Sequence, residues 1–292
     1  MLTANNWKDY QVIATGSGEK LERWKNIYLL RPDPQIIWKN KKDLSKFEGL
    51  HAHYIRSSSG GGKWNILKSF PEEWTVSYKD LVFSIKPMGF KHTGLFPEQA
   101  VNWDKMSELI KNANRPIKVL NLFAYTGGAT VACAKAGATV CHVDCVKQIV
   151  ERAKKNAELS GLKDANIRYI VDDCKKFVER EIRRGNKYDA IIMDPPSFGR
   201  SGNSTVWKLE DDLFDFVKLC KEILVENPLF VLINSYTTGI GATVSENILK
   251  LCLSDKKGTF CSYEIGLPTD EGISLPCGFS ALYYDDSKQK EH

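Results

Sequence analysis

The order of apolar and amphipathic segments between residues 117 and 253 constrains the fold more than any other feature. Apolar stretches of strand length alternate there with segments whose apolar residues recur at the helical period. Such alternation is typical of βαβ units, which build a parallel sheet with ligand sites at the carboxyl ends of its strands. The expected strands are 117–122, 138–144, 167–171, 188–193 and 229–234, and the expected helices are 129–136, 146–160, 175–184, 209–226 and 244–253.

The end of the chain departs from this alternation. Residues 258–266 and 279–284 read as two strands with only a loop between them. A strand pair joined without a helix favours an antiparallel last strand, because a parallel connection needs a long crossover. We therefore predict a Rossmann-like α/β domain with seven strands over residues 97–292, opening with a helix at 97–112.

Residues 1–96 have a different character and predict a small β-rich domain. Short extended segments are separated by prolines and glycines rather than by helical patterns. The expected strands are 11–15, 26–30, 35–38, 51–56, 73–77 and 81–86, with a flexible loop or hairpin tip at 57–62.

Charge and tryptophan also concentrate in this part of the chain. Residues 1–100 hold 15 Lys and Arg against 10 Asp and Glu, so the whole net charge of +5 lies there, together with five of the seven tryptophans. One interpretation is an aromatic core beneath solvated lysines. The other is a basic, aromatic substrate-recognition face for a polyanion such as RNA.

Other classes of protein are disfavoured. No stretch approaches the roughly 18 apolar residues of a membrane span, and the first residues do not resemble a signal peptide. The eight cysteines lie between residues 133 and 277 without a C-x-x-C pair, which argues against a disulfide framework or a zinc site and fits a reducing cytoplasm. We expect no metal, and the sequence leaves the oligomeric state open.

A glycine pair after the first apolar strand predicts a nucleoside site. In the segment 119–129, Gly127 and Gly128 allow a sharp turn into a helix whose first N–H groups are free. Asp144 ends the next strand, where a carboxylate can accept both hydroxyls of a ribose. The glycine pattern of nicotinamide enzymes is absent, so a nucleoside without a pyrophosphate, S-adenosylmethionine, is the expected ligand.

Two further motifs follow the third and fourth strands. Asp173 can accept the adenine amino proton while the Cys174 N–H donates to the ring; helix capping by Asp172 or Asp173 is the structural alternative. In the run Asp194-Pro-Pro-Ser-Phe198, the prolines fix an extended backbone and leave carbonyls and a carboxylate as acceptors for an amine or a base edge. Phe198 offers a stacking face, and the loop 199–205 is a candidate substrate lid with Arg200 for phosphate.

These motifs resemble the class I S-adenosylmethionine-dependent methyltransferases, in particular the branch of 23S ribosomal RNA methyltransferases that act on cytosine C5 or on guanine. The resemblance rests on 121–128, 172–177 and 194–198, on Phe90–Gln99, which is similar to a Lys-x-Thr-Gly-x-(Phe/Tyr)-x-x-Gln segment, and on 266–278. It covers residues 86–284 and implies the seven-stranded methyltransferase sheet. It also implies that Phe96 and Gln99 lie near the cofactor, and Asp194 near the methyl group.

The mechanism depends on where the cysteines lie. Methylation of cytosine C5 needs a thiolate that first adds to C6, but the positions where the family carries that cysteine are Ser197 and 234–236 here. A nitrogen can attack the methyl group directly once it is held in line. The missing cysteine disfavours C5 chemistry, so we expect a methyltransferase that modifies a nitrogen of an RNA base, most readily of ribosomal RNA. The alternatives are a protein or small-molecule methyltransferase and a non-catalytic RNA-binding or assembly factor that retains S-adenosylmethionine.

The predicted site residues fall into three groups. They are Asp194 and Pro195 for catalysis; Pro196, Phe198, Arg200 and Lys91 for the substrate; and Phe96, Gln99, Asn121, Phe123, Ala124, Tyr125, Thr126, Gly127, Gly128, Asp144, Asp173, Cys174 and Asp194 for the cofactor.

Overall fold

The computed structural model describes residues 1–57, 61–200 and 206–286, and the chain forms two compact units. The first unit consists of Met1–Val101 and Ile265–Cys277, and the second consists of Asn102–Glu264 and the chain from Gly278 onward. Within the described residues, no helix is both long and apolar enough to cross a membrane.

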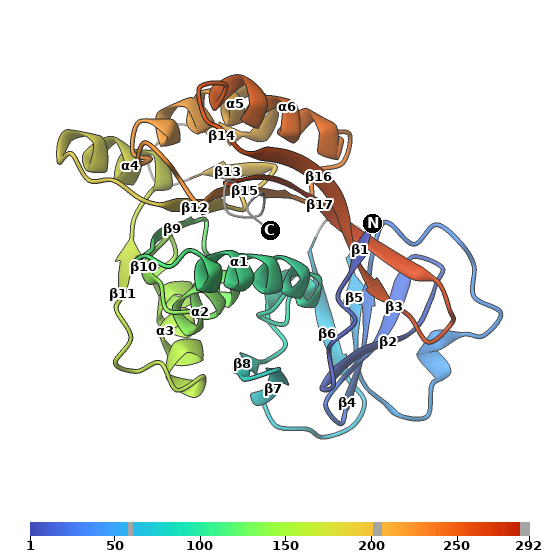
Figure 1. Ribbon diagram of the computed structural model, residues 1–292. Coiled ribbons are helices and arrows are strands. Elements are labelled where there is room, and N and C mark those ends of the chain that lie inside the picture. Colours follow the sequence, from blue (N-terminus) through green and yellow to red (C-terminus); the bar gives the residue numbers. More distant parts are fainter. Residues whose placement is uncertain (58–60, 201–205, 287–292) are drawn as a thin grey trace. The chain divides into compact units, whose positions relative to one another are not determined.

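The second unit is built around a mixed sheet whose central strands are parallel (Figure 1). Its order is β16-β17-β15-β12-β9-β10-β11, and the predicted antiparallel last strand is confirmed, because β17 runs antiparallel to β15. The strands are β9 (Lys118–Leu122), β10 (Thr139–Asp144), β11 (Ile167–Val171), β12 (Ala190–Met193), β15 (Phe230–Ser235), β16 (Thr259–Pro268) and β17 (Ser274–Tyr284).

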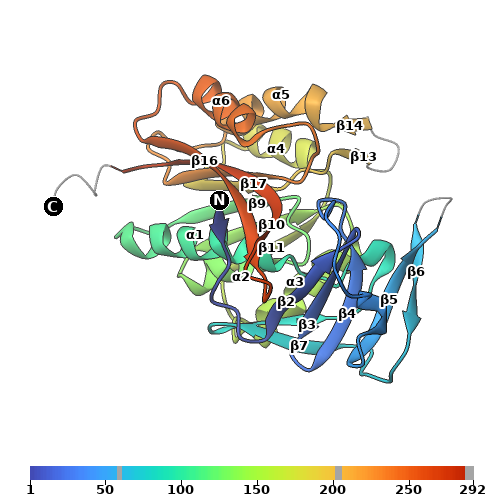
Figure 2. The same cartoon turned by 90° about the vertical axis from the view of Figure 1, so that its right-hand side faces the viewer.

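Helices cover both faces of this sheet, as the alternating sequence pattern predicted. Figures 1 and 2 show α1, α2 and α3 on one face and α4, α5 and α6 on the other. Every residue of β15 is buried, as expected for a parallel strand covered on both sides. The helices are α1 (Ala100–Asn112), α2 (Gly128–Lys135), α3 (Lys147–Leu159), α4 (Cys174–Arg183), α5 (Leu209–Lys221) and α6 (Ala242–Cys252).

The first unit is rich in β-structure, as predicted. Its main sheet has the order β2-β3-β4-β5-β6, with β4 and β5 parallel and the other pairs antiparallel. A separate hairpin joins β7 to β8, and β1 pairs in parallel with Ile265 and Gly266 of β16. The strands are β1 (Leu2–Thr3), β2 (Tyr10–Gly16), β3 (Glu19–Trp24), β4 (Ile27–Pro32), β5 (Leu50–Arg56), β6 (Gly62–Ile66), β7 (Trp74–Tyr78) and β8 (Leu81–Ile85), and the 3-10 turns are η1 (Leu44–Lys46), η2 (Gly89–Lys91) and η3 (Pro97–Gln99).

One predicted strand of this unit is wrong, and three strands were not predicted. Residues 35–38 form a loop, because Ile36 and Trp38 offer their carbonyls to the turn residues Gly18 and Ser17 rather than to a strand. The strands missed are β1, β3 and β6. The predicted loop at 57–62 includes residues 58–60, which lie outside the described part of the chain.

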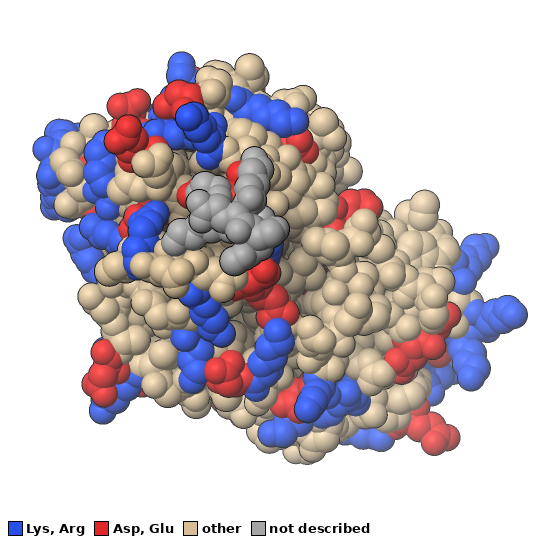
Figure 3. Space-filling model, in the orientation of Figure 1, with Lys and Arg blue, Asp and Glu red and all other residues tan. Residues whose placement is uncertain are grey.

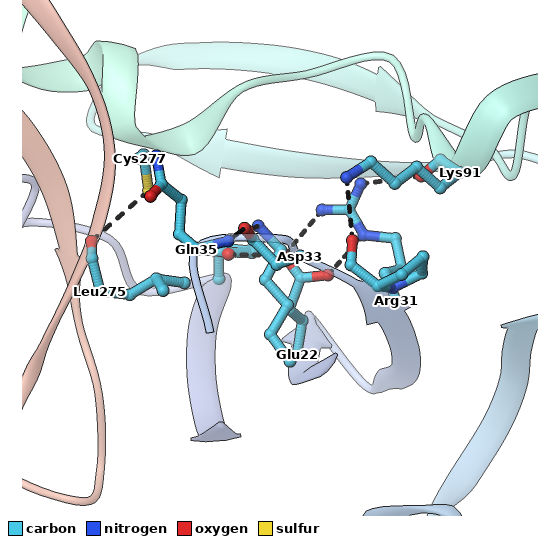
Figure 4. A network of polar contacts seen from close by, with 10 residues as sticks. Glu22, Arg31, Asp33, Gln35, Lys91, Leu275 and Cys277 are labelled. Carbon is cyan, nitrogen blue, oxygen red and sulfur yellow. Dashed lines mark hydrogen bonds and ion pairs between the residues drawn. The ribbon is translucent and has the colours of Figure 1, made fainter. Parts of the chain in front are cut away.

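A buried network of charged side chains holds the inner strands of this sheet (Figure 4). Glu22 is fully buried, and its two carboxylate oxygens accept hydrogen bonds from Arg31 Nε at 2.5 Å, Arg31 Nη2 at 2.7 Å and Tyr10 Oη at 2.7 Å. Burial alone would raise the pKa of Glu22, but Arg31 and Lys20 lower it from 4.5 to about 2. Trp24 lies in the same core with no exposed surface.

Candidate active site

The ends of four neighbouring parallel strands, β12, β9, β10 and β11, lie in one row. Leu122 of β9 pairs with Val143 of β10 on one side and with Met193 of β12 on the other. Asp144 pairs with Val171 of β11, so the last residues of these strands are in register. The segments 123–128, 144–146, 172–174 and 194–198 leave the sheet along this edge, where open α/β sheets bind their ligands.

The segment after β9 is a strained loop tied to its neighbours. Phe123 and Tyr125 have φ values of 52° and 49°, which bulky residues rarely adopt. The Phe123 N–H donates to the Cys174 sulfur at 3.2 Å, and the Tyr125 N–H donates to Asp144 Oδ2 at 3.0 Å. Contacts from two adjacent strand ends therefore hold this loop in a conformation that costs free energy on its own.

The packing of the protein itself requires glycine at positions 127 and 128. Gly127 has a φ of 84°, and a Cβ built on it would lie 2.9 Å from the Ala153 Cβ. A Cβ on Gly128 would lie 2.6 Å from Cζ2 of Trp103. Close packing of α3 and α1 against this turn thus leaves no room for a side chain at either position.

Replacing Gly127 by Ala should destabilise the protein by about 3 kcal/mol, because the left-handed backbone costs about 1 kcal/mol and the overpacking against Ala153 about 2 kcal/mol more. Gly161 is the matched control, since its φ is 74° and a Cβ there would meet nothing within 4 Å. Gly161→Ala should cost only the backbone contribution. Urea denaturation of both variants measures the difference, and equal losses would refute the steric argument.

Asp144 organises the edge of the sheet and keeps acceptor capacity. Its Oδ2 accepts from the Tyr125 N–H and its Oδ1 accepts from the Val146 N–H, each at 3.0 Å. Burial raises the pKa of Asp144 above its usual value, while these backbone hydrogen bonds oppose the rise. Each carboxylate oxygen can accept a second hydrogen bond, so the side chain can still hold two hydroxyl groups.

Asp173 caps a helix and has one oxygen left over. Its Oδ1 accepts from the Lys176 N–H at 3.0 Å, which makes it the N-cap of α4. Its Oδ2 accepts no hydrogen bond from the described residues. The neighbouring Asp172 forms an ion pair with Arg180 instead. Capping and recognition of an amino group are therefore compatible at Asp173.

The Asp-Pro-Pro segment after β12 is only partly available as an acceptor surface. Pro195 is buried and Pro196 is exposed, but the Pro196 carbonyl accepts a hydrogen bond from Trp207 Nε1 at 2.7 Å. The Ser197 hydroxyl bonds to the Thr237 hydroxyl at 2.6 Å. Phe198 is 55% exposed, which leaves its ring free to stack.

An aromatic cluster supports this segment and was not found from the sequence. The rings of Phe123, Trp207 and Phe216 lie 5.5–5.7 Å apart, edge-to-face or tilted. Trp207 belongs to β14 (Val206–Lys208), which pairs with β13 (Phe198–Arg200). The cluster therefore links the strained loop after β9 to the segment after β12. A large aromatic residue just ahead of a helix was the available signal.

Several predicted cofactor residues form hydrogen bonds within the second unit or are buried in it. The Asn121 amide donates to Thr130 Oγ1 at 2.9 Å, and that hydroxyl bonds to His142 Nδ1 at 2.9 Å. The buried Thr126 offers its carbonyl to Asn156. Ala124 is also buried, so these positions shape the loop through backbone and packing, and Asn121 directs its amide toward α2.

For four predicted residues, the second unit does not show a side chain at this edge. Phe96, Gln99 and Lys91 belong to the first unit, where the Lys91 ammonium donates to the Pro32 carbonyl at 2.9 Å. Burial lowers the pKa of Lys91 to about 8. Arg200 is placed as part of β13, but its side chain lies outside the described residues, as do residues 201–205 of the predicted lid.

The cysteines are free thiols held in their protonated form. All eight lie within the described residues, and none is in a disulfide. Burial raises the pKa of each of them, so none has an environment that favours a thiolate. Cys174 is buried and its sulfur accepts the Phe123 N–H.

The polar groups at this edge fit S-adenosylmethionine. Spare acceptor positions on Asp144 suit ribose hydroxyls, and the unengaged oxygen of Asp173 suits an adenine amino group. The start of α2 adds N–H groups at the helix end that favours a carboxylate.

Comparisons with known proteins agree with this geometry. A family model described as S-adenosylmethionine-dependent methyltransferase matches residues 49–248. The ribosomal RNA large subunit methyltransferase I of Aeromonas salmonicida is 37% identical over 110 residues, which cover 37% of this chain and 27% of that protein. The ribosomal RNA large subunit methyltransferase K/L of Syntrophotalea carbinolica is 27% identical over 183 residues, which cover 62% of this chain and 25% of that protein.

A solved structure matches almost the whole chain. The crystal structure of a S-adenosylmethionine-dependent methyltransferase from Agrobacterium tumefaciens has a TM-score of 0.90 and 32% identity, and the match covers 97% of this chain and 92% of that one. By contrast, the chain spans only about a quarter of the length of the two curated relatives named above.

Proposed function

Because the chain belongs to the family of S-adenosylmethionine-dependent methyltransferases, we propose that it transfers the methyl group of S-adenosylmethionine to a base of ribosomal RNA. The observation that carries the proposal is the set of acidic side chains at the carboxyl ends of the parallel strands, with Asp144 ending β10, Asp173 following β11 and Asp194 following β12. This set offers acceptors for a ribose, an adenine and an attacking amine.

The residues of this set would divide the work between cofactor and substrate. S-adenosylmethionine supplies an electrophilic methyl group on a positively charged sulfur. Asp144 would hold the ribose and Asp173 the adenine amino group, while the Cys174 N–H would donate to the adenine ring. Phe96 and Gln99 remain proposed cofactor residues through the family resemblance.

The substrate base would be held at the segment after β12. Asp194 and the Pro195 carbonyl would accept hydrogen bonds from an amine, and the exposed ring of Phe198 would stack on the base. Pro196, Arg200 and Lys91 are proposed to contact the substrate around it. Holding the nucleophile in line with the methyl group supplies most of the catalysis, because such a transfer needs no strong base.

A nitrogen is the proposed target atom. Methylation of cytosine C5 would require a thiolate, and burial raises the pKa of all eight cysteines. Ser197 and the segment 234–236 also stand where related C5 enzymes are expected to carry a cysteine.

RNA is the proposed substrate because the curated relatives are named as ribosomal RNA methyltransferases. The net charge of the first 100 residues supports a polyanion partner. We propose residues 1–96 as the recognition domain and 97–292 as the methyltransferase domain, acting in the cytoplasm, where eight free thiols persist.

The test is methyl transfer to RNA. Purified protein and tritiated S-adenosylmethionine should label total RNA from a strain that lacks the gene, and nucleoside analysis should find the label on a base nitrogen. Asp194→Ala should lower the labelling rate by about 100-fold, the order expected when one transition-state acceptor is removed. Because Asp194 is also a predicted cofactor residue, calorimetric titration of the variant with S-adenosylmethionine separates a loss of cofactor binding from a loss of methyl transfer.

Other outcomes of this assay separate the alternatives. Label in protein alone would favour a protein methyltransferase. Absence of label in every fraction, with S-adenosylmethionine still bound, would favour an RNA-binding or assembly factor. Labelled 5-methylcytidine would contradict the cysteine argument while leaving RNA as the substrate.

A further inference from the structure

A groove in the first unit has an apolar floor and a rim of lysines. Its volume is about 1090 Å³, slightly above the range of about 300–1,000 Å³ that is typical of sites for drug-sized ligands. The floor is formed by apolar side chains of β2 and β3 and by aromatic rings of the loop between β4 and β5. The lining includes Ile13, Leu21, Trp38, Leu44, Phe47 and Ile273.

The rim carries cations that have no acidic partner. Lys39, Lys41 and Lys42 line the groove and are exposed, and none of them forms an ion pair with any of the residues described here. Lys and Arg side chains stand at the right-hand edge of Figure 3, where Figure 1 draws the loop that precedes β5. The rim therefore offers charge that the protein itself does not neutralise.

Two of the three acidic side chains in the lining already accept hydrogen bonds within the protein. Asp43 accepts hydrogen bonds from the Ser45 N–H and hydroxyl and lies 3.7 Å from the Lys46 ammonium. Glu271 accepts from the Thr15 N–H and hydroxyl, each at 2.7 Å. The lining holds the four lysines Lys39, Lys41, Lys42 and Lys46 against the three carboxylates of Asp43, Glu48 and Glu271, so a net positive charge remains.

The loop that carries the lysines is anchored. Trp38 Nε1 donates to Thr15 Oγ1 at 3.0 Å, and the Asn40 amide donates to the Thr15 carbonyl at 2.9 Å and to Glu271 at 2.7 Å. These contacts fix the Trp38 ring along the groove. The lysines on either side of Asn40 are thus presented from a fixed backbone.

We propose that this groove binds an unpaired stretch of the RNA substrate. A base would stack on Trp38 over the apolar floor, and phosphates would lie against Lys39, Lys41 and Lys42. An apolar aromatic surface beside a line of cations is the combination that binds single-stranded nucleic acid. The inference rests on the proposed function for the identity of the polyanion.

The test measures RNA binding separately from methyl transfer. A fluorescent single-stranded RNA is titrated with the full chain at salt concentrations between about 50 and 200 mM. The triple variant Lys39→Ala, Lys41→Ala, Lys42→Ala should bind about tenfold more weakly at the lower salt. The slope of log affinity against log salt should become less negative by about 2, since each of the three lost phosphate contacts to a single strand contributes about 0.7.

The matched control removes the same charge from the second unit. Lys111, Lys154 and Lys163 are exposed and form no ion pair within the described residues, so their triple alanine variant should leave the slope unchanged. Trp38→Ala should weaken binding about tenfold, whereas Trp38→Phe should retain most of the affinity. Thermal unfolding of each variant confirms that it is folded.

The outcomes distinguish this inference from the proposed function. Equal slopes for the two lysine variants, or an unaltered protein that binds no RNA, would overturn the groove assignment. Polyglutamate that competes as well as RNA would overturn the choice of RNA as occupant. RNA binding that depends on the groove without methyl transfer to RNA would support the groove and contradict the proposed function.

Discussion

Replacing Asp144 by Ala should weaken the binding of S-adenosylmethionine by about a thousandfold. The carboxylate is proposed to accept two ribose hydroxyls, and two hydrogen bonds to a charged group together contribute about 4 kcal/mol. The variant also removes the acceptor for the Tyr125 and Val146 N–H groups, so the strained loop after β9 loses one of its ties. Calorimetric titration measures the affinity.

Two further variants make this result interpretable. Asp144→Asn keeps an acceptor for one backbone N–H but loses the charge, and it should bind with an affinity between those of the other two proteins. Asp164→Ala changes an exposed residue outside the row of strand ends and should bind like the unaltered protein. If Asp144→Ala binds within about threefold of the unaltered protein, less than 1 kcal/mol, the ribose assignment is wrong.

Replacing Glu22 by Gln should lower the free energy of unfolding by about 3–5 kcal/mol. Arg31 would then keep its charge in the core, where only 7% of its surface is exposed, without the carboxylate that now accepts its hydrogen bonds. Urea denaturation followed by tryptophan fluorescence measures the loss. The double variant Glu22→Gln, Arg31→Met removes the unpaired charge and should recover most of the stability.

An exposed ion pair is the control for this prediction. Glu151 lies 3.9 Å from Lys147 on the surface of α3, and Glu151→Gln should change the stability by less than about 0.5 kcal/mol. If Glu22→Gln and Glu151→Gln lose the same free energy of unfolding, the buried network stabilises the protein no more than an exposed ion pair does.

The buried pair of Glu22 and Arg31 also predicts how the stability of the protein varies in acid. The pKa of Glu22 is lowered from 4.5 to about 2 in the folded protein, so its contribution is fully present above pH 4.5 and is lost as the pH falls through about 2. Glu22→Gln lacks this titration. The difference in stability between the two proteins should therefore shrink between pH 4.5 and 2.

The α/β domain could be predicted because its signal is local. Strand β12 is a continuous apolar run and β15 begins with four apolar residues, and the intervening helices carry an apolar face, so each element can be recognised from its own residues. The row of strand ends then follows from topology, since parallel strands in register bring their carboxyl ends together.

The parts that escaped prediction depend on distant partners. Strand β3 carries Glu19, Lys20, Glu22 and Arg23, and it is stable because Arg31 on β4 compensates the buried Glu22. Residues 35–38 look like a strand, but they bond to the turn at Ser17 and Gly18.

The support of the active site is equally non-local. Trp207 Nε1 donates a hydrogen bond to the Pro196 carbonyl across a hairpin, and no spacing pattern in the sequence predicts that contact. The same holds for the sulfur of Cys174, which accepts the Phe123 N–H from a loop fifty-one residues earlier in the chain.

The first unit is closed by residues that are synthesised late. Val12 bridges Thr269, Thr15 is held by Glu271, and β1 pairs with Ile265 and Gly266. A ribosome must therefore translate the whole of 102–264 before this unit can acquire its last strand partners. Domains that complete themselves early can fold in order from the N-terminus. The N-terminal unit of this chain can be completed only after residues 265–277 have been synthesised, and we expect such long-range strand pairing to slow its folding.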